Sequence, residues 1–295
     1  MAEPRALRVR CPAKVNLGLW ILGKRRDGYH DVDTVMQTVT LEDELRLEDA
    51  ERGFTLTTRG LPIPGDGLNI LERAWKLLEA EHPRRGLRAR LTKRIPIGAG
   101  LGGGSSDAAG FLRGADRILD LHLSDDGLQS YASALGSDVP FFLRGGTARA
   151  TGRGDVVRHL CPAPPAWIVV ATPPLVISTT WAYGRVRIPL TPRERDASML
   201  AAAIASQDWR SISPHFHNDF EDVVLPEFEV VARLRRALQG SRVLGSLLTG
   251  SGSTVFGLAR TMEEAQSAAR AAAALGASVH VVRTTERGVA LAGHS

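Results

Sequence analysis

Cysteine is scarce in this sequence of 295 residues, and long apolar runs are absent from it. The two cysteines, Cys11 and Cys161, stand far apart and form no disulfide framework, so we expect a protein of the reducing cytoplasm. No apolar run approaches the roughly 20 residues that span a bilayer, which predicts no membrane partner. VNLGLWIL follows several basic residues, but it is short and GKRRD comes next, so we interpret it as a strand rather than an export signal.

Lysine is also rare, since 33 arginines stand against four lysines, namely Lys14, Lys24, Lys76 and Lys93. Arginine therefore supplies positive charge almost everywhere that any cation suffices. A lysine that is kept indicates a position that needs a compact, mobile ammonium, which the planar guanidinium cannot imitate. Chance retention of any single lysine is the alternative. Lys14 and Lys93 stand near the motifs described below.

The formal net charge is +5, which raises the question of a nucleic-acid partner. The basic residues are interspersed with Asp and Glu, and no arginine-rich stripe carries the interleaved aromatics that stack on bases. We therefore predict no nucleic-acid partner. A surplus of positive charge favours an anionic small molecule instead, because it raises the local concentration of such a ligand. The sequence leaves the oligomeric state open.

Strand and helix patterns alternate irregularly along the chain. ALRVRCPAKVNLGLWIL, TVMQTVTL and GFTLTTRG alternate between apolar and polar residues and predict strands. LNILERAWKLLEAEH has helical spacing, with Asn69 as its cap. The proline-rich CPAPPAW indicates a boundary, so we expect domains at 1–160 and 161–295. Because no regular βαβ cadence is present, the α+β class is favoured over a doubly wound sheet.

Residues 95–110, IPIGAGLGGGSSDAAG, concentrate six glycines and two serines ahead of an apolar stretch. Glycine adopts positive φ freely and lets the backbone approach a ligand, at a cost of about 0.5–1 kcal/mol each. Apolar residues recur at helical spacing from Ala108 onward, which predicts an amphipathic helix from about Ser106. Free amides and the positive end of the helix dipole would then face the loop, a geometry that binds anions and above all phosphate.

Two common phosphate loops fit this segment poorly. Gly98, Gly100 and Gly103 satisfy G-x-G-x-x-G, but the next acidic residues of interest, Asp116 and Asp120, fall inside the predicted helix rather than after a second strand. A Walker loop ends in Gly-Lys-Ser/Thr, whereas this one ends in Gly-Ser-Ser. The characteristic segments of protein kinases are not found either. The segment must therefore belong to another type of phosphate loop.

The stretch PIGAGLGGGSS resembles the phosphate loop of the GHMP small-molecule kinases. Other segments stand in that family's order and span most of the chain: PAKVNLGLWILGKRRDGYH, GSDVPFFL, GGTARATGRGD, NDFE and LTGSGSTVF. The resemblance implies two α+β domains, with ATP, Mg²⁺ and substrate in the cleft between them. RRDGYH further implies a kinase for a hydroxyl of a small cytidyl substrate in isopentenyl diphosphate biosynthesis. A homoserine kinase, or a catalytically silent binding protein on the same scaffold, is the alternative.

By this resemblance the loop holds the phosphates of ATP. Its expected ATP-binding residues are Pro96, Ile97, Gly98, Ala99, Gly100, Leu101, Gly102, Gly103, Gly104, Ser105 and Ser106. Ser106 is the expected Mg²⁺ ligand, and either serine hydroxyl can also donate to phosphate. The alternative for each serine is to cap the helix. We interpret Asp107, in the first helical turn, as compensating the helix dipole or capping the helix rather than as a metal ligand.

The same resemblance implies a catalytic pair, Lys14 in PAKVN and Asp138 in GSDVPFFL. Asp138 is the expected general base for the substrate hydroxyl, and Lys14 is the ammonium that orients it and stabilises developing charge. The alternatives are a helix N-cap for Asp138, because Val139 and Pro140 follow it, and a solvated strand lysine for Lys14.

The residues expected to bind the substrate are Asn16, Tyr29, His30 and Tyr183. The two-residue spacing places Asn16 on the same strand face as Lys14. By the resemblance, Tyr29 stacks on the cytosine and His30 hydrogen-bonds its edge. Tyr183 is expected to provide a second stacking ring, with Trp181 as the alternative.

Overall fold

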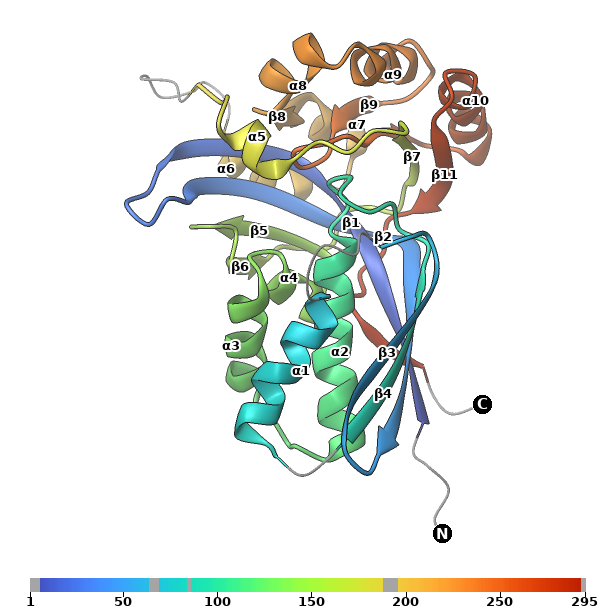
Figure 1. The fold of residues 1–295 in the computed structure, drawn as a ribbon. Coiled ribbons are helices and arrows are strands. Elements are labelled where there is room, and N and C mark those ends of the chain that lie inside the picture. Colours follow the sequence, from blue (N-terminus) through green and yellow to red (C-terminus); the bar gives the residue numbers. More distant parts are fainter. Residues whose placement is uncertain (1–5, 64–68, 84–85, 188–195, 293–295) are drawn as a thin grey trace.

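The computed structural model describes residues 6–63, 69–83, 86–187 and 196–292, and its strands form two sheets, one in each half of the molecule (Figure 1). The first sheet has the order β12-β1-β2-β4-β3. In addition, β5 pairs with β2 and with β6, and β8 pairs with β1. Its strands are β1 (Ala6–Lys24), β2 (His30–Ala50), β3 (Gly53–Gly60), β4 (Gly86–Lys93), β5 (Thr147–Thr151), β6 (Val156–His159), β8 (His217–Asn218) and β12 (Ala290–Ala292). The second sheet has the order β11-β7-β10-β9. Its strands are β7 (Trp167–Thr172), β9 (Gly245–Leu248), β10 (Val255–Ala259) and β11 (Ser278–Arg283).

Helices cover both sheets (Figure 1). Those of the first half are α1 (Ile70–Glu81), α2 (Gly103–Leu119), α3 (Asp125–Leu135) and α4 (Val139–Arg144). Those of the second half are α5 (Thr179–Tyr183), α6 (Ala197–Ile204), α7 (Trp209–Ile212), the 3₁₀ helix η1 (Ser213–His215), α8 (Glu221–Glu227), α9 (Glu229–Gln239) and α10 (Met262–Ala273). Asn69 caps α1 as predicted, and the Glu72 side chain accepts from the Asn69 backbone N–H to complete a capping box. None of the described helices combines the length and apolar character needed to cross a bilayer.

A long antiparallel hairpin, formed by β1 and β2, runs through both halves (Figure 1). Its register shifts three times, after Pro12, Asn16 and Ile21. Such bulges increase the local twist and re-aim side chains, and they are one of the places where a sheet accepts proline. Lys14 and Asn16 lie between the first two shifts and line one cavity. The irregularity of the hairpin thus falls where the polar residues of the site are.

Buried side chains form three clusters, and one of them is shared by the two halves. Phe111 lies in the cluster between the first sheet and its helices, and Leu234 lies in that of the second sheet. The middle cluster joins Val15 and Leu17 of β1 to Ile168 and Phe256 of the second sheet. The α+β class is confirmed by this arrangement. The domain boundary after residue 160 stays a prediction. Two strands that follow this position in the sequence, β8 and β12, pair with β1 of the first sheet.

Candidate active site

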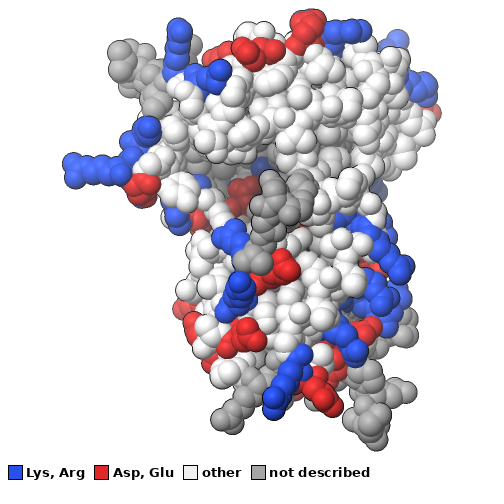
Figure 2. All heavy atoms as spheres, in the orientation of Figure 1, with Lys and Arg blue, Asp and Glu red and all other residues white. Residues whose placement is uncertain are grey.

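Two cavities share the glycine segment as a wall. The first cavity, of about 650 Å³, is bounded further by the β1–β2 turn, the residues before α4, the turn between β5 and β6, and α5. The second cavity, of about 710 Å³, is bounded further by β3, the start of α1 and the end of β4. Gly98, Gly100, Gly102 and Ser105 line both cavities. Figure 2 shows that the molecule is hollowed where its halves meet, and that acidic and basic residues are interspersed on this face.

Three successive carbonyls of the glycine segment are held by hydrogen bonds. Ala99 O accepts from Thr254 N at 3.3 Å, Gly100 O accepts from Thr249 Oγ1 at 3.1 Å, and Leu101 O accepts from Lys14 N at 3.0 Å. In a trans peptide the next amide points opposite to the carbonyl, so the following N–H groups face away from these partners. The structure gives those amides no partner among the described residues. A row of such amides forms an anion-binding concavity.

Helix α2 begins at Gly103, three residues earlier than the sequence predicts. Its N-cap is Gly102, in the left-handed conformation, and no side chain caps the helix. The capping alternative is therefore wrong for Ser105 and Ser106. Ser105 lines both cavities, whereas the Ser106 hydroxyl is fully buried and has no partner among the described residues. The first amides of α2 remain available to a ligand.

Lys14 lies at the inner end of the first cavity and is almost fully buried. Its ammonium donates to Asn16 Oδ1 at 2.6 Å, so the two side chains share a face as predicted. Asn16 in turn donates from Nδ2 to Thr34 Oγ1 at 2.8 Å, and Thr34 donates to Gly18 O at 2.6 Å. The side-chain polar atoms of Lys14, Asn16 and Thr34 are all hydrogen-bonded in this network, which fixes the position of the ammonium.

Asp138 forms an ion pair with Lys14 and lines the same cavity. Its Oδ2 lies 3.5 Å from Lys14 Nζ, and 34% of its side chain is exposed, against 5% for Lys14. Asp138 occupies the N-cap position of α4, but its side chain makes no capping hydrogen bond. The carboxylate is therefore free to face the cavity, and the solvated-strand alternative for Lys14 is wrong.

The second half of the chain reaches the glycine segment through the turn after β9. Thr249 Oγ1 accepts from Asn16 N at 3.1 Å and also lies 3.2 Å from Asn16 Oδ1. Asn218 Nδ2 donates to Leu248 O at 2.8 Å and to Gly250 O at 2.9 Å, so β8 holds this turn in place. Sequence reasoning recognised LTGSGSTVF but missed Thr249 and Asn218, whose partners are far away along the chain.

Aromatic rings form the other wall of the first cavity. His30 stacks on Tyr183 with ring centroids 4.7 Å apart, and Tyr183 packs edge-on against Phe220. Trp181 instead packs against Phe228 beneath the Arg185 guanidinium and does not line the cavity. Burial and the nearby Lys24 charge lower the pKa of His30, which keeps the imidazole neutral near pH 7. Tyr29 lines the same cavity and is 55% exposed.

A buried triad of one lysine and two aspartates, which sequence reasoning missed, supports the glycine segment. Lys93 donates to Asp43 and, at 2.7 Å, to Asp107 Oδ2. Asp43 Oδ1 also accepts from the backbone N–H groups of Arg94 and Ile95, at 2.5 and 2.9 Å. Asp107 thus has a buried cation as its partner, and the dipole interpretation made from sequence does not describe its contacts. The rarity of lysine was the available signal, because Lys93 and Lys14 are the buried members of the four.

The fold and this site define a class, the GHMP small-molecule kinases. Residues 69–146 match the GHMP kinases N terminal domain, and residues 200–278 match the GHMP kinases C terminal domain. A homoserine kinase from Cytophaga hutchinsonii superimposes with a TM-score of 0.70 over 99% of each chain at 20% identity, which shows the shared fold.

Closer relatives carry one name. Proteins called 4-diphosphocytidyl-2-C-methyl-D-erythritol kinase from Pelotomaculum thermopropionicum and a Synechococcus species are each 41% identical to this chain. They cover 87% of it, and 90% and 86% of their own lengths. A crystal structure of 4-(cytidine 5'-diphospho)-2C-methyl-D-erythritol kinase matches with a TM-score of 0.78 and 35% identity over 94% of this chain and 98% of its own. The chain belongs to this kinase family.

Proposed function

We infer that the protein transfers the γ-phosphoryl group of ATP to the 2-hydroxyl of 4-diphosphocytidyl-2-C-methyl-D-erythritol. This is a step of the non-mevalonate route to isopentenyl diphosphate. The names of the relatives support the reaction, and their coverage extends over both halves of the chain. The observation that carries the proposal is the position of Lys14 and Asp138. Both line a cavity that is bounded on one side by the glycine segment and on another by the aromatic rings.

The reaction needs a hydroxyl oxygen in line with the γ-phosphorus and a group that takes its proton. The Asp138 carboxylate makes no helix-capping hydrogen bond. In our proposal it accepts that proton as the oxygen–phosphorus bond forms and ADP leaves. Lys14 donates to the reacting oxygen and holds Asp138 through its charge, because its ammonium lies 3.5 Å from the carboxylate. Asn16 keeps the ammonium in place and lines the same cavity, where it is positioned to contact the acceptor.

The nucleotide is proposed to lie against the glycine segment and to extend into the second cavity. The unpartnered amides that follow Ala99, Gly100 and Leu101, together with the first amides of α2, would bind its phosphates. The proposed contacts thus cover Pro96 to Ser106, of which all but Ser106 line the second cavity. Only backbone groups and serine hydroxyls are required there, which explains why the loop needs no lysine of its own.

The residues present fit Mg²⁺, which proteins hold with few side chains and mainly through substrate phosphates and water. The Ser106 hydroxyl is buried without a partner, and Ser105 lies on both cavities one residue away. Ser106 would hold the ion together with the phosphates, and the bound ion would neutralise phosphate charge. Within the described ranges, no three carboxylate, imidazole or thiol side chains come together as a metal site.

The cytosine is proposed to lie among Tyr29, His30 and Tyr183. A neutral His30 offers a ring nitrogen as acceptor to the edge of the base, and lowering of its pKa by burial supports that state. Tyr183 lines the cavity while Trp181 does not, so we assign the second stacking role to Tyr183. A cytoplasmic location and the absence of a nucleic-acid partner stay predictions of the sequence.

The experiment is a turnover assay with Mg²⁺ and ATP that measures ADP release. The cytidyl substrate, homoserine, mevalonate and galactose are tested in parallel at equal concentration. We expect turnover with the cytidyl substrate to exceed that with the other three by orders of magnitude. Preference for homoserine would contradict the assigned substrate, and no turnover with any acceptor would identify a binding protein on a kinase scaffold.

A further inference from the structure

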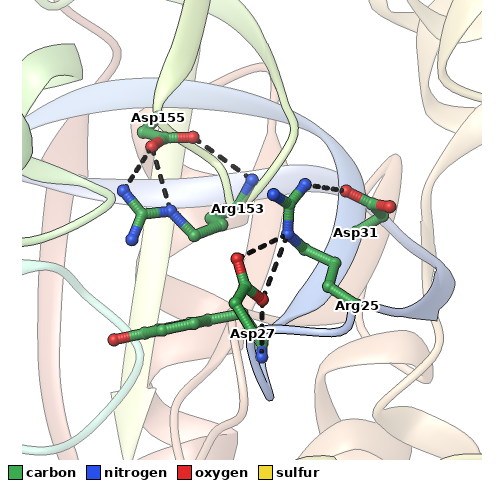
Figure 3. Close-up of polar contacts among 6 residues, drawn as sticks. Arg25, Asp27, Asp31, Arg153 and Asp155 are labelled. Carbon is green, nitrogen blue, oxygen red and sulfur yellow. Dashed lines mark hydrogen bonds and ion pairs between the residues drawn. The ribbon is translucent and has the colours of Figure 1, made fainter.

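Tyr29 sits at the tip of the β1–β2 turn with its ring half in solvent. The backbone of the turn is well fixed, because Tyr29 N donates to Asp27 Oδ1 at 3.1 Å and Arg25 N donates to Tyr29 O at 2.8 Å. The Arg25 side chain forms ion pairs with Asp27 at 3.1 Å and with Asp31 at 2.7 Å, which close the turn (Figure 3). The ring itself has no such anchor among the hydrogen bonds of the described residues. An exposed ring loses rotamer freedom when it orders on a ligand, which weakens binding.

Arg153 comes from another element and covers the Tyr29 ring. Its guanidinium carbon lies 5.1 Å from the ring centroid, within cation–π range. Arg153 belongs to the turn between β5 and β6, which is joined to the hairpin because Val32 N donates to Gly152 O at 2.8 Å. Two loops that are distant in sequence therefore meet at this ring, and both residues line the first cavity.

The Arg153 guanidinium is itself held in one orientation. Asp155 Oδ2 accepts from its Nε at 3.1 Å and from its Nη2 at 2.7 Å, and Asp155 Oδ1 accepts from Arg153 N (Figure 3). A guanidinium that is hydrogen-bonded through two of its nitrogens has a fixed orientation, so its planar face can stack on a ring. The neighbouring Gly154 lies near Ser137, the residue before Asp138, since a Cβ added to Gly154 would be 3.7 Å from the Ser137 side chain and both residues line the first cavity. The same turn thus connects the aromatic wall with the segment that carries the carboxylate.

We propose that Arg153 is a positioning residue that determines affinity for the cytidyl group by stacking on one face of Tyr29. The covered ring is then ordered before the ligand arrives and offers its other face to the base. Asp155 sets the plane of the guanidinium and so acts on the Tyr29 ring through Arg153. This inference rests on the proposed function, since it assumes that Tyr29 stacks on cytosine.

The competing role for Arg153 is direct contact with the diphosphate of the substrate. The two roles differ in which ligand they affect and in whether they need the Tyr29 ring. If Arg153 acts by stacking on Tyr29, its loss weakens binding of uncharged cytidine and of CDP alike, and this effect disappears when the Tyr29 ring is removed. If Arg153 contacts phosphate, its loss weakens binding of CDP far more than binding of cytidine, and this effect persists without the Tyr29 ring.

The test is calorimetric titration of cytidine and of CDP into the wild type, Arg153→Gln, Tyr29→Ala and the double variant. We expect Arg153→Gln to raise the Kd of both ligands by about 3- to 10-fold in the wild-type background. In the Tyr29→Ala background we expect a change below about twofold, because the stacking partner is already gone. Arg153→Lys, which keeps the charge and loses the planar fork, is expected to lie between wild type and Arg153→Gln.

Arg158→Gln is the matched control, because Arg158 is an exposed arginine on β6, the strand that follows the Arg153 turn, and does not line the cavity. Its Kd values are expected to equal those of the wild type. An Arg153→Gln effect that persists in Tyr29→Ala, or one confined to CDP, overturns the inference and leaves the proposed function intact. A wild type that binds neither ligand contradicts the proposed function, and the inference falls with it.

Discussion

Lys14 and Asp138 face each other across 3.5 Å, one almost fully buried on β1 and the other partly exposed at the start of α4. The burial of Lys14 is supported by Asn16, and its backbone N–H binds the glycine segment directly. Lys14 therefore contacts both the glycine segment, through its backbone N–H, and the Asp138 carboxylate, through its ammonium.

The first prediction concerns this pair. We expect Lys14→Ala and Asp138→Asn each to lower kcat by roughly 10²–10⁴-fold, because in the proposed mechanism each removes a group that acts on the reacting oxygen. Steady-state kinetics with the cytidyl substrate measure the effect, and urea unfolding verifies the fold. Lys76→Ala and Asp126→Asn, at exposed positions of α1 and α3, are the controls. A kcat near the wild-type value in either site variant would remove that residue from the mechanism.

The second prediction uses two glycines of the same segment. Gly100 has φ of +79° and a Cβ there would overlap the Thr249 carbonyl, whereas a Cβ on Gly104 meets nothing within 4 Å. We expect Gly100→Ala to destabilise the protein by about 1–3 kcal/mol. Gly104→Ala should leave stability unchanged or slightly higher and should raise the KM for ATP, because its methyl group would enter the space in which we propose that the phosphates bind. Equal effects of the two changes on stability would contradict the description of the loop.

The third prediction separates the two aromatic alternatives. We expect Tyr183→Ala to raise the KM of the cytidyl substrate by about 10- to 100-fold with little change in kcat, because a stacked base is worth about 1–3 kcal/mol. Tyr183→Phe should restore binding. Trp181→Ala should lower the free energy of unfolding, since Trp181 packs on Phe228, and should leave KM nearly unchanged. A larger KM effect from Trp181→Ala would assign the base to that ring instead.

The fourth prediction concerns the pH dependence of stability. Burial raises the pKa of Asp107 to about 8 in the folded protein, although the Lys93 ammonium opposes the shift; Asp43 shares that ammonium. In the unfolded chain the pKa returns to about 3.9. Between these values the folded protein holds a proton that the unfolded chain has released. The free energy of unfolding therefore falls as pH rises, by up to about 1.4 kcal/mol per unit.

Asp107→Asn tests this linkage because it removes the titrating group and keeps the shape of the side chain. Urea unfolding of both proteins is compared at pH 5 and pH 7, and shared titrations cancel in the difference. We expect the variant to gain stability relative to the wild type as pH rises. Parallel pH profiles would show that Asp107 is ionised in the folded protein.

Local patterns predicted the parts of the fold that depend on local interactions. Alternation gave the long strands, and Asn69 caps α1 as expected. The start of α2 was placed too late, because glycine is a poor helix former and the run of glycines concealed the first turn. Gly103 is nevertheless helical, and it packs so closely on Ile95 that an added Cβ would lie 2.9 Å from that side chain. Tertiary contact overrides local propensity at this position.

The site depends more on long-range contacts, and these were harder to predict. The meeting of Lys14 and Asp138 followed from the family resemblance rather than from spacing. Nothing local pairs Lys93 with Asp43 and Asp107, which lie on different elements, although the rarity of lysine singled out Lys93. The stacking of Arg153 on Tyr29 had no signal at all, because it arises only when two turns meet in space.

The central claim is that the phosphoryl group passes from a nucleotide on the glycine segment to a hydroxyl held by Lys14 and Asp138. A crystal structure with a nonhydrolysable ATP analogue and the cytidyl substrate tests it most directly. We predict that the phosphates accept hydrogen bonds from the amides of Gly100 to Gly102 and that the 2-hydroxyl contacts both Lys14 and Asp138. A γ-phosphate bound elsewhere, or a 2-hydroxyl out of reach of the pair, would contradict the account.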